Sequence, residues 1–319
     1  MNPKKRRENG PFGRIAAIIA GVCVLSAAAY CQQPSQQKRA EPGSVGRPLT
    51  GGPVFKDVEY VAGGHERQKL DIYLPAQRSE SPLPLIIWVH GGAWQGGSKE
   101  NCPARRFVQR GYAVASINYR LSRHAVFPAQ IEDCKAAVRY LRANAGKYGF
   151  DPNQFGAWGA SAGGHLVALL GATGGVKEFE KGESLNVSSR VQAVCDYFGP
   201  TDFTLISRFP STMAHDAPDS PEARLIGGPI QENKDKCKRA NPITYVTKDD
   251  PPFLIVHGDK DPLVPHNQSE ILCESLQKAG VKAKLHIVEG GGHGFKDPAI
   301  EKMVEDFFDS RLKPAKKDC

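Results

Sequence analysis

Residues 155–170 read FGAWGASAGGHLVALL, and this stretch decides the fold of the chain. A short apolar run, Phe155–Gly159, leads into the pattern Gly-x-Ser-x-Gly centred on Ser161, and a helical pattern begins at Gly163. A turn that joins a buried strand directly to a helix strains its central residue and pushes that side chain outward, so small residues must flank it. The hydroxyl then stands at a helix N-terminus, whose free amides favour negative charge. The pattern predicts Ser161 as a nucleophile; a loop that only caps a helix is the alternative.

Apolar strands alternate with amphipathic helices on both sides of this turn. An opening hairpin is expected at Val54–Ala62 and Gln68–Leu74, because apolar and polar residues alternate in its second strand. The further expected strands are Leu85–His90, Tyr112–Asn118, Phe155–Gly159, Val191–Phe198, Phe253–His257 and Ala283–Val288, and the expected helices are Pro103–Arg110, Gln130–Ala143, Gly163–Leu170, Ser269–Ala279 and Ala299–Leu312. This order predicts an α/β fold with one mostly parallel sheet, covered by helices on both faces.

The two ends of the chain differ from its body in charge. The net charge is +8, of which residues 1–50 carry +6 and residues 311–319 carry +3, so residues 51–310 are left at −1. A nucleic-acid binder carries its positive charge on the folded domain, so no nucleic-acid partner is expected. With 40% hydrophobic and 24% charged residues, the composition excludes a disordered chain, a fibrous repeat and a multi-span membrane protein.

The N-terminus predicts export. Four basic residues, Lys4–Arg7, precede an apolar run from Ile15 to Ala29. At about 15 residues, this run is short for a spanning helix and has the length of the apolar region of a signal peptide. The small residues before Tyr30 permit cleavage there. An uncleaved membrane anchor and lipidation at Cys31 are the alternatives, and all three place the domain outside the cytoplasm, with membrane attachment through the N-terminus only.

The composition along the chain suggests its domain limits. Residues 1–29 are expected to be a signal peptide or anchor, and residues 30–53 a flexible linker rich in Gln, Pro, Gly and Ser. The folded domain is expected at 54–312, followed by a basic tail at 313–319. Residues 199–252 break the alternation of strands and helices, so they are expected to form a small insertion, a partial cap, after the sixth strand.

Eight cysteines raise the question of disulfides and metal. None forms a Cys-x-x-Cys pair or has the spacing of zinc ligands, so no metal site is expected. An exported chain tolerates disulfides, and Cys102 with Cys134, on neighbouring predicted helices, is the pair we expect. Cys195 lies in an apolar strand and is expected to be a buried small side chain.

A glycine-rich turn ends the strand Leu85–His90 and reads His90-Gly-Gly-Ala-Trp94. Attack on an ester carbonyl places negative charge on oxygen, and backbone amides fixed beforehand stabilise that charge. The amides of Gly92, Ala93 and Ala162 are the expected oxyanion donors. Trp94 is expected to line the substrate pocket, and packing against the insertion is its alternative.

A serine needs a histidine base and a carboxylate that orients the histidine. His293 lies in a glycine-rich segment just after the last predicted strand, at the sheet edge where Ser161 is expected. Six other histidines lie in a strand, in less suitable loops or without a neighbouring acid: His90, His124, His165, His215, His266 and His286. Asp261 is the expected carboxylate, because Pro262 stiffens its loop and it lies farther from the strand end than Asp259, which is expected to brace the turn.

These motifs carry a resemblance. The segments HGGAW (90–94), GAWGASAGG (156–164), FGPTD (198–202), HGDKD (257–261) and GHG (292–294) follow one another over some 200 residues. From about residue 54 to 312 the chain resembles α/β-hydrolase fold serine esterases, and is similar to their hormone-sensitive-lipase-like and feruloyl/acetyl-xylan-esterase-like (BD-FAE-like) branches. The resemblance implies an α/β-hydrolase fold, the chain order Ser161, Asp261, His293, and hydrolysis of carboxylic esters without a metal or organic cofactor.

The residue before the nucleophile bears on the substrate. The lipase-like branch often has an acid there, whereas this chain has Ala160, which favours the xylan- and ferulate-esterase-like branch. A small ester or an esterified polysaccharide is the substrate that this implies; oligomeric state, acyl chain and alcohol stay open. HGGAWQ (90–95) also resembles aryl formamidases, and a catalytically silent binding module of the same fold is the non-enzyme alternative.

Overall fold

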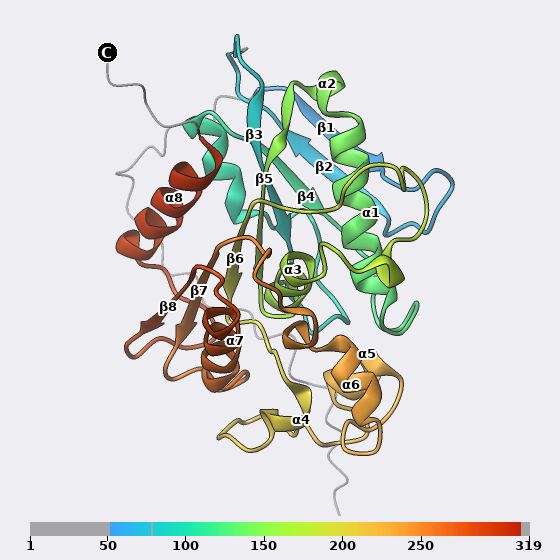
Figure 1. The fold of residues 1–319 in the computed structure, drawn as a ribbon, viewed down its shortest axis with the longest axis vertical. Helices are drawn as coiled ribbons and strands as arrows, with labels where there is room; N and C mark the ends of the chain where they lie inside the picture. Colours follow the sequence, from blue (N-terminus) through green and yellow to red (C-terminus); the bar gives the residue numbers. More distant parts are fainter. Residues whose placement is uncertain (1–51, 78, 314–319) are drawn as a thin grey trace, which may run out of the picture. The chain divides into compact units, whose positions relative to one another are not determined.

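The computed structural model describes residues 52–77 and 79–313, whose eight strands form one sheet in the order β1-β2-β4-β3-β5-β6-β7-β8 (Figure 1). The hairpin strands β1 (Val54–Glu59) and β2 (Lys69–Tyr73) are antiparallel, and β2 is also antiparallel to β4. All other neighbours run parallel. The remaining strands are β3 (Leu83–Val89), β4 (Ala113–Ile117), β5 (Phe150–Ala160), β6 (Ala193–Tyr197), β7 (Phe253–Gly258) and β8 (Ala283–Val288).

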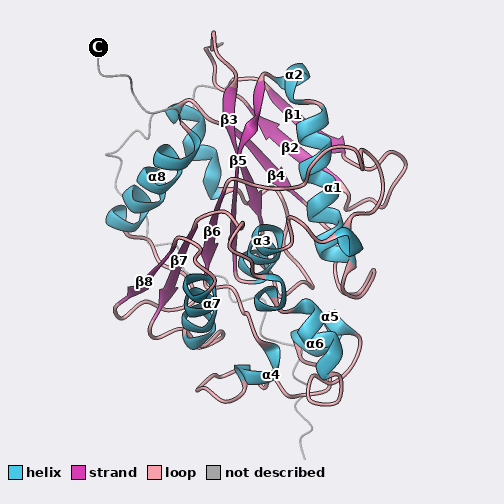
Figure 2. Cartoon of the chain, viewed as in Figure 1, coloured by secondary structure: helices cyan, strands magenta, loops and turns pink. Residues whose placement is uncertain are grey.

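Helices cover both faces of this sheet (Figure 2). Between and after the strands lie the 3-10 helices η1 (Pro103–Arg110), η2 (Lys177–Phe179) and η3 (Pro242–Tyr245), and the α-helices α1 (Ala129–Ala143), α2 (Ala145–Tyr148), α3 (Ala162–Ala172), α4 (Phe203–Ile206), α5 (Pro221–Ile226), α6 (Lys234–Ala240), α7 (Asn267–Lys278) and α8 (Pro298–Leu312). The mostly parallel sheet with helices on both faces confirms the predicted α/β-hydrolase fold.

Alternate residues of the central strands pack on opposite faces. In β3, Ile87 belongs to the core that contains Ile131 of α1 and Leu166 of α3, whereas Trp88 belongs to the core that contains Phe308 of α8. Successive side chains of a strand point to opposite faces, so a sheet covered on both sides needs continuous apolar runs. This requirement explains why these strands were recognisable in the sequence.

Three local features differ from the expectations. The segment Pro103–Arg110 is a 3-10 helix, and a short helix, Ala145–Tyr148, follows α1. β5 begins at Phe150, five residues before the expected start. Its first part pairs with β3 across a register shift and includes exposed polar residues, so no apolar run marks it in the sequence.

The segment 199–252 lies between β6 and β7 and contains α4, α5, α6 and η3. Figure 1 shows α4, α5 and α6 grouped at one end of the sheet. Side-chain caps begin three of these short helices, because Asp202, Ser220 and Asn241 accept hydrogen bonds from amides two or three residues further on. No helix here is longer than seven residues, so no amphipathic repeat could reveal them in the sequence.

The expected disulfide between Cys102 and Cys134 is wrong. Both thiols are free and buried, and they lie in different cores on opposite faces of the sheet. The two predicted helices follow each other along the chain, but the sheet lies between their two cysteines. Cys195 is fully buried in β6, as expected, and burial raises the pKa of its thiol well above the ordinary value.

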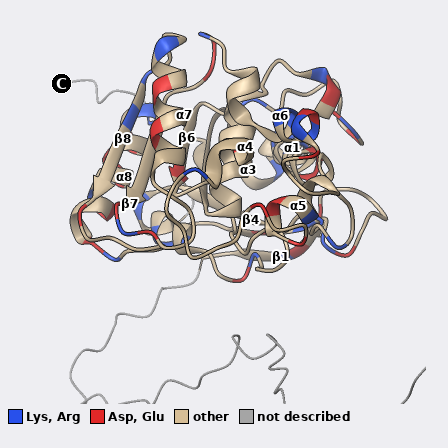
Figure 3. Cartoon of the chain, turned by 90° about the horizontal axis from the view of Figure 1, so that it is seen from below, with Lys and Arg blue, Asp and Glu red and all other residues tan. Residues whose placement is uncertain are grey.

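The expected signal peptide, nearly all of the expected linker (30–53) and nearly all of the expected basic tail (313–319) fall on residues 1–51 and 314–319, outside the described residues. Among the helices of the described part, none is long and apolar enough to cross a membrane. Figure 3 shows basic and acidic positions interspersed along the ribbon of the described domain, in keeping with the near-neutral charge of residues 51–310.

Candidate active site

Ser161 lies at the sharp turn between β5 and α3. Its backbone has φ +56° and ψ −123°, a conformation that L-residues rarely adopt. The flanking glycines are sterically required: a Cβ on Gly159 would lie 2.2 Å from the Gly163 carbonyl oxygen, and one on Gly163 would lie 2.1 Å from the Val89 carbonyl oxygen. The amide of Ser161 donates to the Tyr197 carbonyl at 2.8 Å, which ties the turn to β6.

The structure brings the side chains of Ser161, His293 and Asp261 into one hydrogen-bonded chain. The Ser161 hydroxyl lies 3.1 Å from Nε2 of His293, and Nδ1 of His293 lies 2.7 Å from Oδ2 of Asp261. Ser161 follows β5, Asp261 follows β7 and His293 follows β8, so three parallel strands carry the three residues to the same edge of the sheet. This geometry lets the imidazole take the hydroxyl proton while the carboxylate holds the ring.

Asp261 is held by four groups of its surroundings. Oδ1 accepts from the amides of Leu263 and Val264, and Oδ2 faces both His293 and Nε2 of His257, the latter at 3.2 Å. Burial raises the pKa of Asp261. The hydrogen bonds from His257 and His293 together lower it by more than burial raises it, so the pKa lies well below its ordinary value. The residue is therefore an anion at neutral pH.

His257 was missed by the sequence reasoning. It ends β7 fully buried, with Nδ1 2.7 Å from the Ser269 hydroxyl and Nε2 2.9 Å from the Val264 carbonyl oxygen. The only signal was its place four residues before Asp261. The strand pattern assigned it to the core, and the turn that brings it back to the carboxylate is a tertiary feature.

The loops of Asp261 and His293 are locked together by their backbones. Asp259 accepts from the Gly290 amide at 2.6 Å, and Lys260 donates its amide to the Gly291 carbonyl at 2.8 Å. A Cβ on Gly258 would lie 2.2 Å from the Gly291 carbonyl oxygen. Asp259 therefore braces the loop, and Asp261 is the aspartate that reaches the histidine.

The turn after β3 has an unusual backbone conformation. Gly92, Ala93 and Trp94 all have positive φ, at +111°, +54° and +55°. In the described part of the chain, no protein acceptor takes the amides of Gly92 or Ala93, and Ala162 is the first residue of α3, whose amide has no partner within the helix. Gly92, Ala93 and Ala162 all line the same pocket as Ser161.

A cavity of about 430 Å³ opens at these residues. Its wall is largely apolar and includes Trp94, Phe198 and, from the 199–252 segment, Met213 and Pro221. The Phe198 ring lies 4.6 Å from that of His293. Trp94 is 1% exposed, and its ring packs edge-on against His165 and Phe203. The two positions expected for Trp94 are therefore not exclusive, because it lines the pocket and also packs against the insertion.

Two other histidines near the site are neutral supports. Nε2 of His90 faces the Arg67 guanidinium at 2.9 Å, and burial lowers the pKa of His90 to about 4. Burial also lowers the pKa of His165 to about 4, and its Nε2 lies 2.8 Å from the Ala240 carbonyl oxygen. Neither ring reaches the Ser161 hydroxyl.

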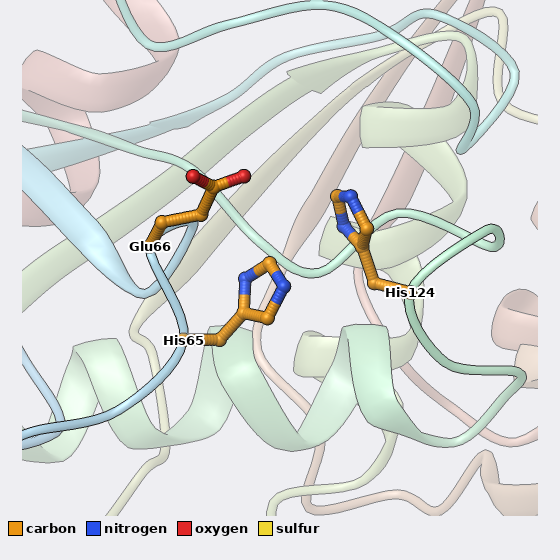
Figure 4. A group of neighbouring side chains, drawn as sticks. All are labelled: His65, Glu66 and His124. Atoms are coloured by element: carbon orange, nitrogen blue, oxygen red, sulfur yellow. The ribbon is translucent and has the colours of Figure 1, made fainter.

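One group of residues has the composition of a metal site. His65, Glu66 and His124 bring ligand atoms within 4.8 Å of one another (Figure 4). Each nitrogen of His124 already faces a protein donor, the Leu121 amide at Nδ1 and Nε of Arg123 at Nε2, although a neutral imidazole can accept at only one of them. Burial and then the neighbouring His65 and Arg123 lower the pKa of His124, which indicates cationic surroundings. A metal ion would have to displace Arg123, so the arrangement is not that of a built metal site.

Comparison with known proteins adds to this geometry. The BD-FAE family model matches residues 70–276. Esterase LipC of Mycobacterium tuberculosis is 32% identical over 238 residues, which cover 73% of this chain and 58% of LipC. The chain spans between 51% and 62% of the length of LipC and seven further curated relatives, among them plant isoprenylcysteine methylesterases named as such or as probable ones.

Two solved structures are also similar. A truncated carbohydrate esterase from gut microbiota is 38% identical with a TM-score of 0.76, and the match covers 84% of this chain and 99% of that one. A bifunctional GH43-CE protein of Bacteroides eggerthii is 39% identical with a TM-score of 0.75, covering 81% of this chain and 35% of that one. The relatives favour ester hydrolysis over the formamidase and silent-module alternatives.

Proposed function

The chain belongs to the BD-FAE family, and we propose on that basis that it is a serine carboxylesterase. Ser161 is the nucleophile, His293 the general base and acid, and Asp261 the carboxylate that orients His293. The amides of Gly92, Ala93 and Ala162 form the oxyanion hole, and Trp94 lines the substrate pocket. The observation that carries the proposal is the unbroken hydrogen-bond chain from Ser161 through His293 to Asp261.

The mechanism follows from that chain. His293 takes the proton of Ser161 as the hydroxyl oxygen attacks the ester carbonyl, and the free amides receive the negative charge on the carbonyl oxygen. His293 then gives the proton to the departing alcohol. A water molecule, deprotonated by the same imidazole, cleaves the acyl-enzyme and restores the serine. Asp261 stays ionised throughout, because the hydrogen bonds around it keep its pKa low.

The substrates we propose are short-chain esters or acetyl and feruloyl esters of the plant-cell-wall type. Two features support this class: Ala160 before the nucleophile, and the similarity to a carbohydrate esterase over 84% of this chain. The basic N-terminus with its apolar run supports export, with either cleavage after Ala29 or retention as an anchor.

Replacement of the nucleophile tests the proposal. Ser161→Ala should lower kcat on p-nitrophenyl acetate by on the order of 10⁴-fold or more and abolish labelling by a fluorophosphonate. Ser310→Ala removes an exposed hydroxyl of α8 and should leave both unchanged, which makes it the matched control. Circular dichroism should show both variants folded. Full turnover by a folded Ser161→Ala protein would remove Ser161 from the mechanism.

A further inference from the structure

A second histidine–carboxylate pair lies at the active-site pocket. Glu222, on α5, lines the cavity together with Ser161 and His293, although it is only 2% exposed. Its Oε1 lies 3.0 Å from Nδ1 of His215, which is likewise 2% exposed. Apart from Ser161 and His293, Glu222 is the only lining residue with an ionisable or hydroxyl-bearing side chain among those described.

The two oxygens of the Glu222 carboxylate differ in their surroundings. Oε1 is paired with His215, but Oε2 is buried and has no hydrogen-bond donor among the described residues. A buried carboxylate oxygen without a donor costs free energy, so such an atom calls for an explanation. A glutamate that served only to hold His215 would not need to belong to the wall of the pocket.

A buried donor on the same wall also lacks a partner. The indole N–H of Trp94 meets no acceptor in the described part of the chain, and Trp94 lines the cavity. A plain alkyl group would leave both the indole N–H and Oε2 of Glu222 unpaired. A hydroxyl group both donates and accepts hydrogen bonds, so it has the chemistry to pair with an acceptor such as Oε2 and with a donor such as the indole N–H.

His215 holds Glu222 in place. Its Nε2 lies 3.0 Å from the carbonyl oxygen of Leu263, in the loop whose amides hold Asp261. Burial lowers the pKa of His215, but the Glu222 carboxylate and the Leu263 carbonyl raise it more, so the net pKa lies above its ordinary value. With acceptors at both ring nitrogens, His215 is held in place and in turn fixes Oε1 of Glu222, while Oε2 stays without a donor among the described residues.

We propose that Glu222 is a specificity-determining residue, whose Oε2 accepts a hydrogen bond from a free hydroxyl on the alcohol portion of the ester. An acetyl group has no hydrogen-bond donor, so in an acetyl ester the donor must belong to the alcohol. The site is thus built for esters of polyols and sugars rather than for esters of plain alkanols. This inference rests on the proposed esterase function.

The test uses two substrates that differ by one hydroxyl, trans-2-hydroxycyclohexyl acetate and cyclohexyl acetate. After correction for their alkaline hydrolysis rates, the wild type should favour the hydroxylated ester in kcat/KM by about tenfold or more. In Glu222→Gln, an amide that donates can replace the accepting Oε2. This variant should lose most of that preference, because its loss of kcat/KM should fall far more on the hydroxylated ester than on cyclohexyl acetate. Glu232→Gln makes the same change at an exposed position of the same segment and should alter neither.

Three results would overturn the inference. One is an equal loss of kcat/KM on both esters in Glu222→Gln, which assigns Glu222 a bracing role only. Another is an unchanged preference in that variant. The third is a wild-type ratio near one, which decides the question even if Glu222→Gln does not fold.

Binding separates this inference from the proposed function. In a Ser161→Ala background, calorimetry should show the hydroxylated ester binding about tenfold more tightly than cyclohexyl acetate, and adding Glu222→Gln should remove the difference. This result is expected whether or not the wild type turns the esters over. Equal binding of the two esters overturns the assignment of Glu222 and leaves the catalytic role of Ser161 to its own assay.

Discussion

Two histidine–carboxylate pairs reach the same pocket from two regions of the molecule. The pair His293–Asp261 comes from loops at the ends of parallel strands, and the pair His215–Glu222 comes from the 199–252 segment. In the first pair the carboxylate is fully satisfied, and the histidine points its second nitrogen at the Ser161 hydroxyl. In the second pair the second nitrogen of the histidine faces the Leu263 carbonyl, and one oxygen of the carboxylate has no donor among residues 52–77 and 79–313.

The difference shows how the same two residue types perform different tasks. A histidine can shuttle a proton only if one nitrogen faces a reacting group, and the His293 side chain is 19% exposed whereas that of His215 is 1% exposed. The sheet positions Ser161, His293 and Asp261, whose reacting atoms must be held in a fixed geometry relative to one another. The segment between β6 and β7 supplies part of the pocket wall, and there Oε2 of Glu222 is proposed to discriminate between substrates.

The largest expected difference in kcat is between His293→Gln and His215→Gln, which make the same change in the two pairs. His293→Gln should lower kcat on p-nitrophenyl acetate by on the order of 10⁴-fold, because His293 is the one imidazole of the described residues that is hydrogen-bonded to the Ser161 hydroxyl. His215→Gln should lower kcat by less than about tenfold, since it acts only through the loop of Asp261. Steady-state kinetics of the two folded variants checks this, and comparable losses in both would erase the distinction between the pairs.

Two neighbouring aspartates sharpen the comparison within the first region. Asp261→Asn should lower kcat by on the order of 10³- to 10⁴-fold, because an amide favours the wrong tautomer of His293. Asp259→Asn removes a charge but keeps an oxygen that can accept from the Gly290 amide, so it should cost less than about tenfold. The measurement is kcat at saturating ester. The assignment of the carboxylate is wrong if Asp259→Asn proves the more damaging change.

The rigidity of the first region can be tested at the elbow. Gly163→Ala should destabilise the fold by about 1–3 kcal/mol, because the new methyl would lie against the Val89 carbonyl oxygen and force a backbone shift. This corresponds to a melting temperature lowered by about 2–10 °C for a domain of this size. Gly146→Ala, in the open helix α2, should leave the melting temperature unchanged or raise it. Equal melting curves for the two variants would contradict the close approach of strand and helix.

The smallest expected effect concerns pH. The pKa of His215 is raised in the folded protein, so the folded state binds more protons than the unfolded state between the ordinary and the raised pKa. The stability that this histidine contributes is therefore fully present below the ordinary pKa and is lost as pH rises through the folded-state value. The gap in melting temperature between wild type and His215→Gln should be wider at pH 5.5 than at pH 8.5.

The control for this pH effect is His266→Gln. His266 is partly exposed, and its nearest carboxylate, Glu270, is 3.7 Å away. Water and salt screen such a pair, so its contribution to the pH dependence of the melting temperature should be small. A gap for His215→Gln that stays constant with pH would mean that His215 is not charged in the folded protein at pH 5.5.

The residues of the first region could be selected from the sequence because each lies within a few residues of a recognisable element. Ser161 stands between an apolar run and a helical pattern, and His293 and Asp261 follow buried strands of a parallel sheet. Parallel strands deliver their carboxyl ends to one edge, so residues far apart in the chain were expected to meet. The second region offered no such signal, because its short helices and turns show no periodicity, and His215 was set aside as a loop residue.

The sequence by itself determined the order of the strands and a mostly parallel sheet covered on both faces, because alternating runs of apolar residues leave few ways to bury both faces of a sheet. The resemblance of its motifs to known esterases added the α/β-hydrolase fold. Only the tertiary structure decided that His257 turns back onto Asp261, that Cys102 and Cys134 lie on opposite faces of the sheet, and that Glu222 reaches the pocket with one oxygen unpaired. Local patterns report which faces of an element are buried. They do not report which side chains from distant loops share a contact, since that depends on how the finished sheet and its insertion pack together.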